Sequence, residues 1–155
     1  MNLWNVSTDV CDKELIPFNG NKYLIGNGYF GIRGTMEEYT KENMCAINLS
    51  GIYDRVGDSW RESVNPPNPL LTYIVINGVK YALPESTPKS HIQTLDFRGA
   101  IHTRETVWET QNGDVTVKCE RFASMDCHNI IGMKYSVTAD FDCEAEIVTG
   151  VDGDV

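Results

Sequence analysis

No apolar run in this sequence approaches the roughly 18 residues that a membrane-spanning helix requires. The N-terminus, Met1-Asn2-Leu3-Trp4-Asn5, also lacks the basic start and apolar core of a secretory signal. We therefore expect a cytoplasmic protein with no membrane partner. An apolar fraction of 41% with 23% charged residues is typical of a globular domain, and 155 residues suffice to bury one core.

Basic residues are few and dispersed along the chain. Thirteen Lys and Arg residues stand against 22 Asp and Glu residues, which gives a formal net charge of −9. Because affinity for nucleic acid depends mainly on clustered positive charge, the sequence predicts no nucleic-acid partner.

Spacings typical of disulfide frameworks or metal sites are missing as well. The chain has five cysteines with no C-x-x-C pair: Cys11, Cys45, Cys119, Cys127 and Cys143. Its three histidines, His91, His102 and His128, show no metal-ligand spacing. We expect reduced thiols, no metal and no cofactor. The group Asp126-Cys127-His128 is disfavoured as a catalytic or metal site, because neighbouring side chains on an extended chain diverge.

Glycine is concentrated in residues 24–34, where Gly26-x-Gly28-x-x-Gly31 matches the spacing of a dinucleotide-binding loop. Such a loop opens into a helix, but here Ile32-Arg33-Gly34 follows, and a glycine costs about 1 kcal/mol inside a helix. Nucleotide binding is therefore disfavoured. The glycines instead predict a tight bend between short strands at residues 22–25 and 29–35, where backbones approach closely.

Two adjacent carboxylates, Glu37 and Glu38, follow the glycine stretch. Neighbouring side chains on an extended segment point to opposite faces, which disfavours a catalytic pair. We interpret residues 37–42 as a charged, solvent-exposed connector.

Helical patterns are nearly absent. Residues 12–16 could form one turn, which Pro17 and Asn19-Gly20-Asn21 should end. About nine or ten short strand patterns cover most of the remaining chain and predict an all-β protein, an antiparallel β-sandwich. The chain ends at Val155 without a turn or a polar tail, so we expect an incomplete portion of a sandwich.

Two Asn-Gly dipeptides predict two-residue β-hairpins of type I′. The first, Asn77-Gly78, sets these pairs: Ile76/Val79, Ile74/Tyr81 and Val75/Lys80. The second, Asn112-Gly113, sets these: Trp108/Val117, Thr106/Cys119, Thr110/Val115 and Glu105/Glu120. The last pair is interpreted as solvent-exposed, not as an acid/base couple, because the face that carries it is polar.

Residues 55–68 form a long polar excursion with a proline-rich exit. Long loops on a strand scaffold often carry function, and Trp60 either covers its own core or contacts a partner or a sugar ring. Both alternatives stay open. The candidate residues for a carbohydrate site or a domain interface are Tyr53, Asp54, Trp60, Arg61, Asn65 and Asn68.

Residues 24–38, LIGNGYFGIRGTMEE, resemble the opening "LGNGYLGVRG…EE" segment of glycoside hydrolase family 65, which contains the maltose, kojibiose and trehalose phosphorylases. Further segments follow in the family's order: residues 51–54, 64–70, 95–99 with Thr103-Arg104, and 121–126. Pro66 departs from the family, where leucine is more common. The residues that carry the motif are Gly26, Asn27, Gly28, Gly31, Arg33 and Gly34.

The resemblance implies a galactose mutarotase-like super-sandwich, of which residues 1–155 would be the first part. In the family this domain precedes a catalytic (α/α)6 barrel, which this chain lacks. Inorganic phosphate, or water in the trehalase-like members, attacks an α-glucosidic disaccharide with inversion while a barrel glutamate protonates the leaving oxygen. No catalytic residue is therefore expected here. The implied role is barrel docking and homodimerisation; the alternative is a stand-alone carbohydrate-binding module.

Overall fold

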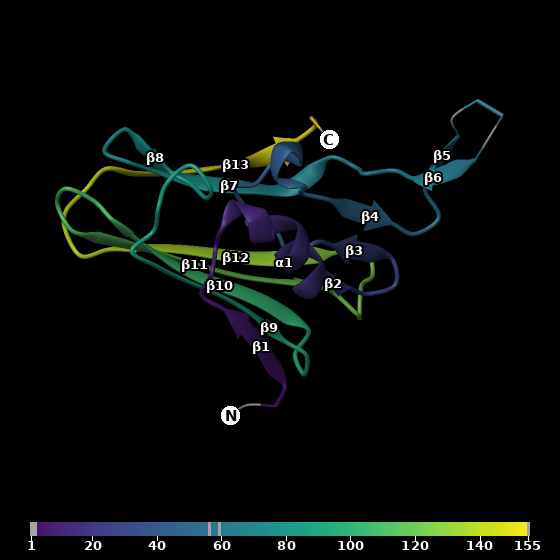
Figure 1. The fold of residues 1–155 in the computed structure, drawn as a ribbon, viewed down its shortest axis with the longest axis horizontal. Coiled ribbons are helices and arrows are strands. Elements are labelled where there is room, and N and C mark those ends of the chain that lie inside the picture. The colour runs from purple at the N-terminus through teal and green to yellow at the C-terminus, as the bar shows by residue number, and fades with distance from the viewer. Residues whose placement is uncertain (1–2, 56, 59, 155) are drawn as a thin grey trace.

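The structure, a computed structural model, describes residues 3–55, 57–58 and 60–154. Antiparallel strands are the main secondary structure of this part of the chain, which confirms the predicted all-β sandwich (Figure 1). The strands are β1 (Asn5–Thr8), β2 (Ile25–Gly26), β3 (Phe30–Ile32), β4 (Ile47–Leu49), β5 (Tyr53–Arg55), β6 (Arg61–Ser63), β7 (Asn68–Ile76), β8 (Val79–Tyr81), β9 (Ser90–Asp96), β10 (Ile101–Glu109), β11 (Asp114–Ala123), β12 (Ile131–Ala139) and β13 (Ala145–Asp152).

Two layers face each other (Figure 1). Among the described residues, one layer is a five-stranded sheet in the order β1-β9-β10-β11-β12, and the other is a three-stranded sheet in the order β13-β7-β8. A small sheet, β2-β3-β4, lies at one end of the sandwich, and the β5–β6 hairpin projects beyond it.

The core lies between the layers because the strands alternate buried and accessible positions. Trp108, Val115 and Val117 of the five-stranded sheet pack in one cluster with Ile74 and Ile76 of β7. A second cluster lies at the end that carries β2-β3-β4; its buried members are Tyr23, Ile25, Ile32, Ile47, Leu70, Leu95 and Ala123.

The helical segments are η1 (Lys13–Leu15), α1 (Ile16–Lys22) and η2 (Lys41–Asn43). The prediction that Pro17 and Gly20 end the helix is wrong, since α1 runs through both. Pro17 lies in the first turn, where no intrahelical bond needs its missing N–H. Gly20 lies under the Arg33 guanidinium, and a Cβ there would come 2.6 Å from Nη2. Tertiary packing therefore decides that the helix continues through these residues.

The first hairpin is confirmed in register. Ile74 pairs with Tyr81 and Ile76 with Val79, and Asn77 and Gly78 adopt φ values of 49° and 79°. Both central residues lie in the left-handed region that a type I′ turn requires.

The predicted pairing register of the second hairpin is wrong by two residues. Trp108 pairs with Val115, and Thr106 pairs with Val117. Thr110 closes a longer loop because both its backbone N–H and its hydroxyl donate to the Gly113 carbonyl. Since side chains alternate with period two, this shift keeps every residue on its predicted face.

The same shift separates the two acidic residues that were expected to oppose each other. Glu105 lies opposite Lys118, 2.8 Å from its ammonium group, and Glu120 pairs with Thr103. The directly opposed pair Glu105/Glu120 is therefore wrong.

Candidate functional site

The glycine motif is tied to the sandwich by Asn27. Its Oδ1 accepts hydrogen bonds from the backbone N–H groups of Tyr29 (3.0 Å) and Phe30 (2.8 Å). Its Nδ2 donates to the carbonyls of Ser124 (2.6 Å) and His128 (3.0 Å). One buried side chain therefore shapes the bend and also attaches it to the loop after β11.

Gly34 occupies a point of close approach. A Cβ at this position would lie 2.7 Å from the Tyr23 carbonyl carbon. The Gly34 N–H donates to the Gly20 carbonyl (2.8 Å), and its own carbonyl accepts from Gln93 Nε2 (2.6 Å). The motif thus forms the tight bend that its sequence predicts, with backbones in contact.

Glu37 and Glu38 correct the sequence interpretation. Both carboxylates are buried, with side-chain exposures of 0% and 2%. The prediction of a solvent-exposed connector is therefore wrong for these two residues. Arg104 Nε donates to Glu37 Oε2 (2.7 Å), and its Nη2 donates to Glu38 Oε2 (2.5 Å). Adjacent side chains reach one guanidinium because residues 37 and 38 lie in a turn, not in an extended segment.

Arg121 completes this buried ion cluster, which we define as Glu37, Glu38, Arg104 and Arg121. Its Nη1 lies 3.3 Å from Glu37 Oε1, and its Nη2 donates to the Thr35 carbonyl. Two carboxylates face two guanidinium groups, so the formal charge sums to zero. Burying any one of these ions without its partners would cost several kcal/mol.

Burial and neighbouring charge act in opposite directions on the two carboxyls. Burial pushes the pKa of Glu37 upward, but Arg104 and Arg121 outweigh it and hold this pKa below its ordinary value. Burial raises the pKa of Glu38, which Arg104 only partly offsets and Glu37 reinforces. The Leu83 N–H donates to Glu38 Oε1 (3.2 Å) and stabilises the carboxylate.

Two buried histidines adjoin the cluster in neutral form. Gln93 Nε2, which can only donate, lies 2.8 Å from His102 Nε2, so this nitrogen accepts and the ring proton is on Nδ1. Burial, reinforced by both arginines, lowers the pKa of His102. His91 Nδ1 lies 2.9 Å from Thr106 Oγ1, and burial, with Arg104, lowers its pKa to about 4.

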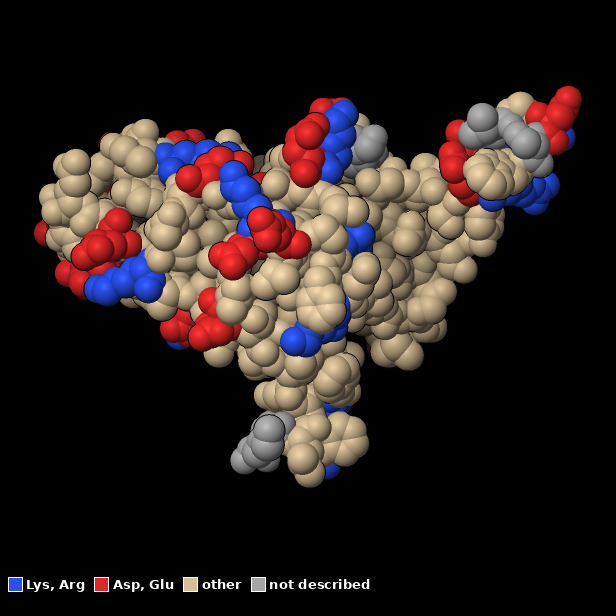
Figure 2. All heavy atoms as spheres, viewed as in Figure 1, with Lys and Arg blue, Asp and Glu red and all other residues tan. Residues whose placement is uncertain are grey.

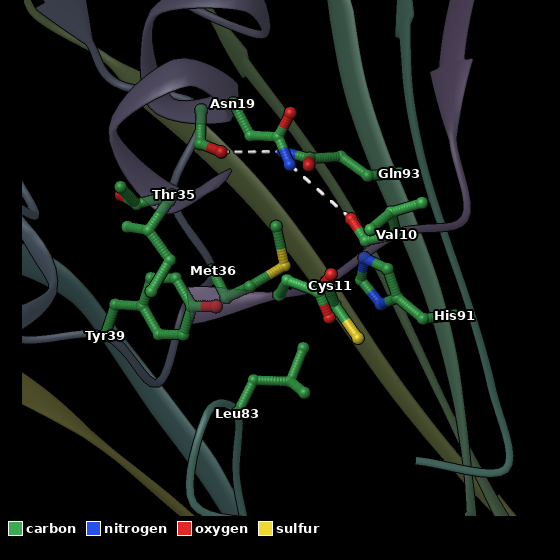
Figure 3. Close-up of a pocket in the computed structure, with 12 residues that line it drawn as sticks. Val10, Cys11, Asn19, Thr35, Met36, Tyr39, Leu83, His91 and Gln93 are labelled. Atoms are coloured by element: carbon green, nitrogen blue, oxygen red, sulfur yellow. Dashed lines mark hydrogen bonds between the residues drawn. The ribbon is translucent and has the colours of Figure 1, made fainter. Parts of the chain in front are cut away.

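A small pocket of about 20 Å³ lies beside α1, between the motif and β9 (Figure 3). His91 and Gln93 approach it from β9, and Met36, Tyr39 and Leu83 form much of the opposite wall. Burial raises the pKa of Cys11 and of Tyr39 at this pocket. Because the thiol and phenol stay protonated and His91 stays neutral at pH 7, neither Cys11 nor Tyr39 is an activated nucleophile.

The six candidate residues from the sequence divide into two groups. Tyr53, Asp54 and Arg61 lie on the exposed β5–β6 hairpin, and Trp60, just before β6, is 71% exposed. The structure brings these four to one projecting element.

The two asparagines of the same set lie within the fold instead. Asn65 accepts from the Ile47 N–H (2.9 Å) and donates to the Cys45 carbonyl (3.4 Å). Asn68 is buried, and its Oδ1 accepts from the Leu70 N–H (3.0 Å).

The ion cluster is the feature that sequence reasoning missed. The sequence did contain a signal for it. Arg104 alternates along its strand with Thr106 and Trp108, and this set of side chains faces the core. An arginine in a core-facing position requires a buried acid, and Glu37-Glu38 is the acidic pair of the motif.

Within residues 3–55, 57–58 and 60–154, no group of three or more His, Cys, Asp or Glu residues is arranged to hold a metal ion. No helix in that part of the chain is long and apolar enough to cross a membrane.

A family model, "Glycosyl hydrolase family 65, N-terminal domain", matches residues 7–155. The chain belongs to this family. It is 51% identical over 152 residues to a nigerose phosphorylase of Lachnoclostridium phytofermentans, a match covering 98% of this chain and 20% of that enzyme. It is 35% identical over 140 residues to a kojibiose phosphorylase of Escherichia coli, covering 85% of this chain and 18% of the relative.

The fold is shared with a solved structure from the same group of enzymes. A chain described as a kojibiose phosphorylase candidate from the human microbiome superimposes with a TM-score of 0.85 at 16% identity. The superposition covers 93% of this chain and 21% of that one. The family 65 chain described here thus spans about a fifth of the length of these relatives.

Proposed function

We propose that this chain is the non-catalytic N-terminal region of an inverting α-glucoside phosphorylase and supports docking of the catalytic barrel and dimerisation. The disaccharide and inorganic phosphate would be bound by the barrel, so the chain itself would need no cofactor. The family match over residues 7–155 and the coverage of a fifth of the relatives' length support this assignment.

The observation that carries the proposal is how the family motif uses its polar groups. Asn27, Gly34 and Glu37 direct their hydrogen bonds and ion pairs to other parts of the sandwich. Residues committed to such contacts stabilise a fold and are not available to bind a disaccharide. The motif therefore fits a supporting domain better than a substrate site.

An activity assay on two proteins tests the proposal. The first is the 155-residue chain; the second is the L. phytofermentans nigerose phosphorylase with its matching segment replaced by this chain. Each is incubated with nigerose, kojibiose or maltose and inorganic phosphate, and glucose 1-phosphate is measured. We expect product only from the chimera. Product from the 155-residue chain alone, or an insoluble or inactive chimera, would contradict the proposal.

A stand-alone carbohydrate-binding module is the second candidate, favoured by one observation. Trp60 and Tyr53 are 71% and 57% exposed on the projecting hairpin, and aromatic rings of this kind stack on sugar faces. Titration of the chain with gluco-oligosaccharides, followed by tryptophan fluorescence, tests it. Saturable quenching that disappears in Trp60→Ala would favour this candidate, whereas an unchanged signal up to millimolar sugar would contradict it.

A further inference from the structure

An uncharged groove of about 320 Å³ lies at the end of the sandwich that carries β2-β3-β4. Its lining residues are Phe30, Ile47, Leu49, Pro66, Pro67, Pro69, Asn129 and Ile131. None of these carries a charge, although the protein has 35 Asp, Glu, Lys and Arg residues. In Figure 2 the visible surface below the projecting hairpin is almost free of charged atoms. Apolar surface of this kind marks sites of contact with another body.

The β5–β6 hairpin arises directly from the rim of this groove. Leu49 lines the groove four residues before β5 begins, and Pro66 lines it three residues after β6 ends. The prolines at the exit restrict the backbone and hold this rim in one shape. Groove and hairpin therefore form one continuous surface, which we call the end surface.

The charges of the hairpin are arranged unfavourably for an isolated element. Asp54 lies directly opposite Glu62, and Arg55 lies directly opposite Arg61, so like charges face each other across both pairs. Directly opposed like charges destabilise an antiparallel pair, and a two-stranded hairpin is marginal in water. The hairpin forms a separate two-stranded sheet, and its six strand residues are exposed. An exposed ion pair between Arg55 and Asp58 (3.2 Å) partly offsets the second repulsion. A partner with complementary charges would relieve what remains.

We propose that the end surface is the docking surface for the remaining four-fifths of a family 65 phosphorylase chain, with the groove as its apolar centre and the hairpin as its charged rim. The inference rests on the proposed function and names the surface that it uses. An apolar centre with a polar rim is the usual anatomy of a protein interface. The length of the relatives supplies the occupant, since this chain accounts for 20% of the nigerose phosphorylase.

A second copy of this chain fits the surface less well. Each copy carries a formal charge of −9, so association would bring two strongly acidic bodies together.

The test compares variants in the 155-residue chain and in the nigerose phosphorylase chimera described above. The groove variant is Asn129→Glu, which places a charge at an exposed groove position. The matched control is Phe97→Glu, at a 58% exposed position that does not line the groove. We expect the groove variant to lower the Tm of the chimera by roughly 5 °C and that of the chain by less than about 1 °C. The control should change neither protein.

A charge reversal on the hairpin gives effects of opposite sign. Arg61→Glu places an opposite charge across from Arg55, so it should leave the Tm of the chain unchanged or raise it. In the chimera the same variant should lower the Tm and the rate of nigerose phosphorolysis. A purely local role for Arg61 would move both proteins in the same direction.

Every other outcome of these experiments contradicts a specific part of the proposal. If the chimera is active and its variants behave like the control, the end surface is not the docking surface, and the proposed function stands. Variants that destabilise the chain as much as the chimera overturn docking in favour of local folding. Dimerisation of the chain in sedimentation that is abolished by the groove variant assigns the surface to a second copy. A chimera that is insoluble or inactive overturns the proposed function and this inference together.

Discussion

The buried ion cluster and the β5–β6 hairpin use the same types of side chain in opposite ways. In the cluster, Arg104 bridges Glu37 and Glu38 with contacts of 2.7 and 2.5 Å, and opposite charges meet away from water. In the hairpin, like charges face each other across exposed strands, and the ion pair of Arg55 with Asp58 is itself exposed. Water screens the second arrangement but not the first. The cluster therefore stabilises the domain itself, whereas the hairpin is suited to meeting something outside it.

Removal of the central arginine should produce the largest difference between the two regions. Arg104→Met leaves Glu37 and Glu38 buried without their shared partner, so we expect a loss of about 3–5 kcal/mol in the free energy of unfolding. Arg61→Ala on the hairpin is the matched control and should stay within about 0.5 kcal/mol of the parent. Urea unfolding followed by circular dichroism measures both. Equal losses in the two variants would remove the distinction between the regions.

The motif glycine at the closest backbone contact should produce the next largest effect. Gly34→Ala drives a methyl group against the backbone of Tyr23, so we expect a destabilisation of about 2–3 kcal/mol. Gly57→Ala, at a hairpin glycine with open space around its Cα, is the comparison. Because its φ of 62° is unfavourable for alanine, we expect a loss of about 1 kcal/mol at this position. Thermal unfolding of both variants checks the order, and a larger loss at Gly57 would reverse the comparison.

As the pH is lowered, the region of the buried ion cluster should lose stability at a higher pH than the hairpin. The folded-state pKa of His91 is about 4, below the ordinary value near 6.5, so the unfolded chain binds more protons between these values. Stability therefore falls as the pH drops from about 6.5 to 4, by about 3 kcal/mol for this group. His102 acts in the same direction, while the raised pKa of Glu38 opposes it.

The control for this pH dependence is His91→Gln, which removes the titrating group. Urea unfolding at a series of pH values should give a flatter profile for the variant than for the parent. Identical slopes between pH 4 and 6.5 would show that His91 does not carry this dependence.

The sequence predicted most of the fold because alternation and turn chemistry are local signals. The Asn77-Gly78 hairpin was correct to the residue, and the second hairpin kept its faces although its register differed by two. The loop at Thr110–Gly113 could not be read from the dipeptide alone. Asp140, which lies outside the hairpin, also contacts this end of it, because its carboxylate accepts from the Asp114 N–H.

The ion cluster was less accessible to prediction. Glu37 and Glu38 were assigned to solvent because an extended backbone was assumed, whereas a turn directs both toward Arg104, 66 or more residues away in the chain. The alternation of β10 places Arg104 on the core face, but no local pattern shows that residues 37 and 38 turn toward it. The candidate residues divided for a similar reason, since Asn65 and Asn68 differ from Trp60 only in what the folded chain brings beside them.

Amide hydrogen exchange of the 155-residue chain tests the central distinction most directly, because it reports local stability in both regions at once. Amides of β10 and β11, which carry Arg104 and Arg121, should exchange only through global unfolding. Amides of β5 and β6 should exchange at rates close to those of an unfolded peptide. Protection of the hairpin equal to that of β10 and β11, or rapid exchange around Arg104, would contradict the account.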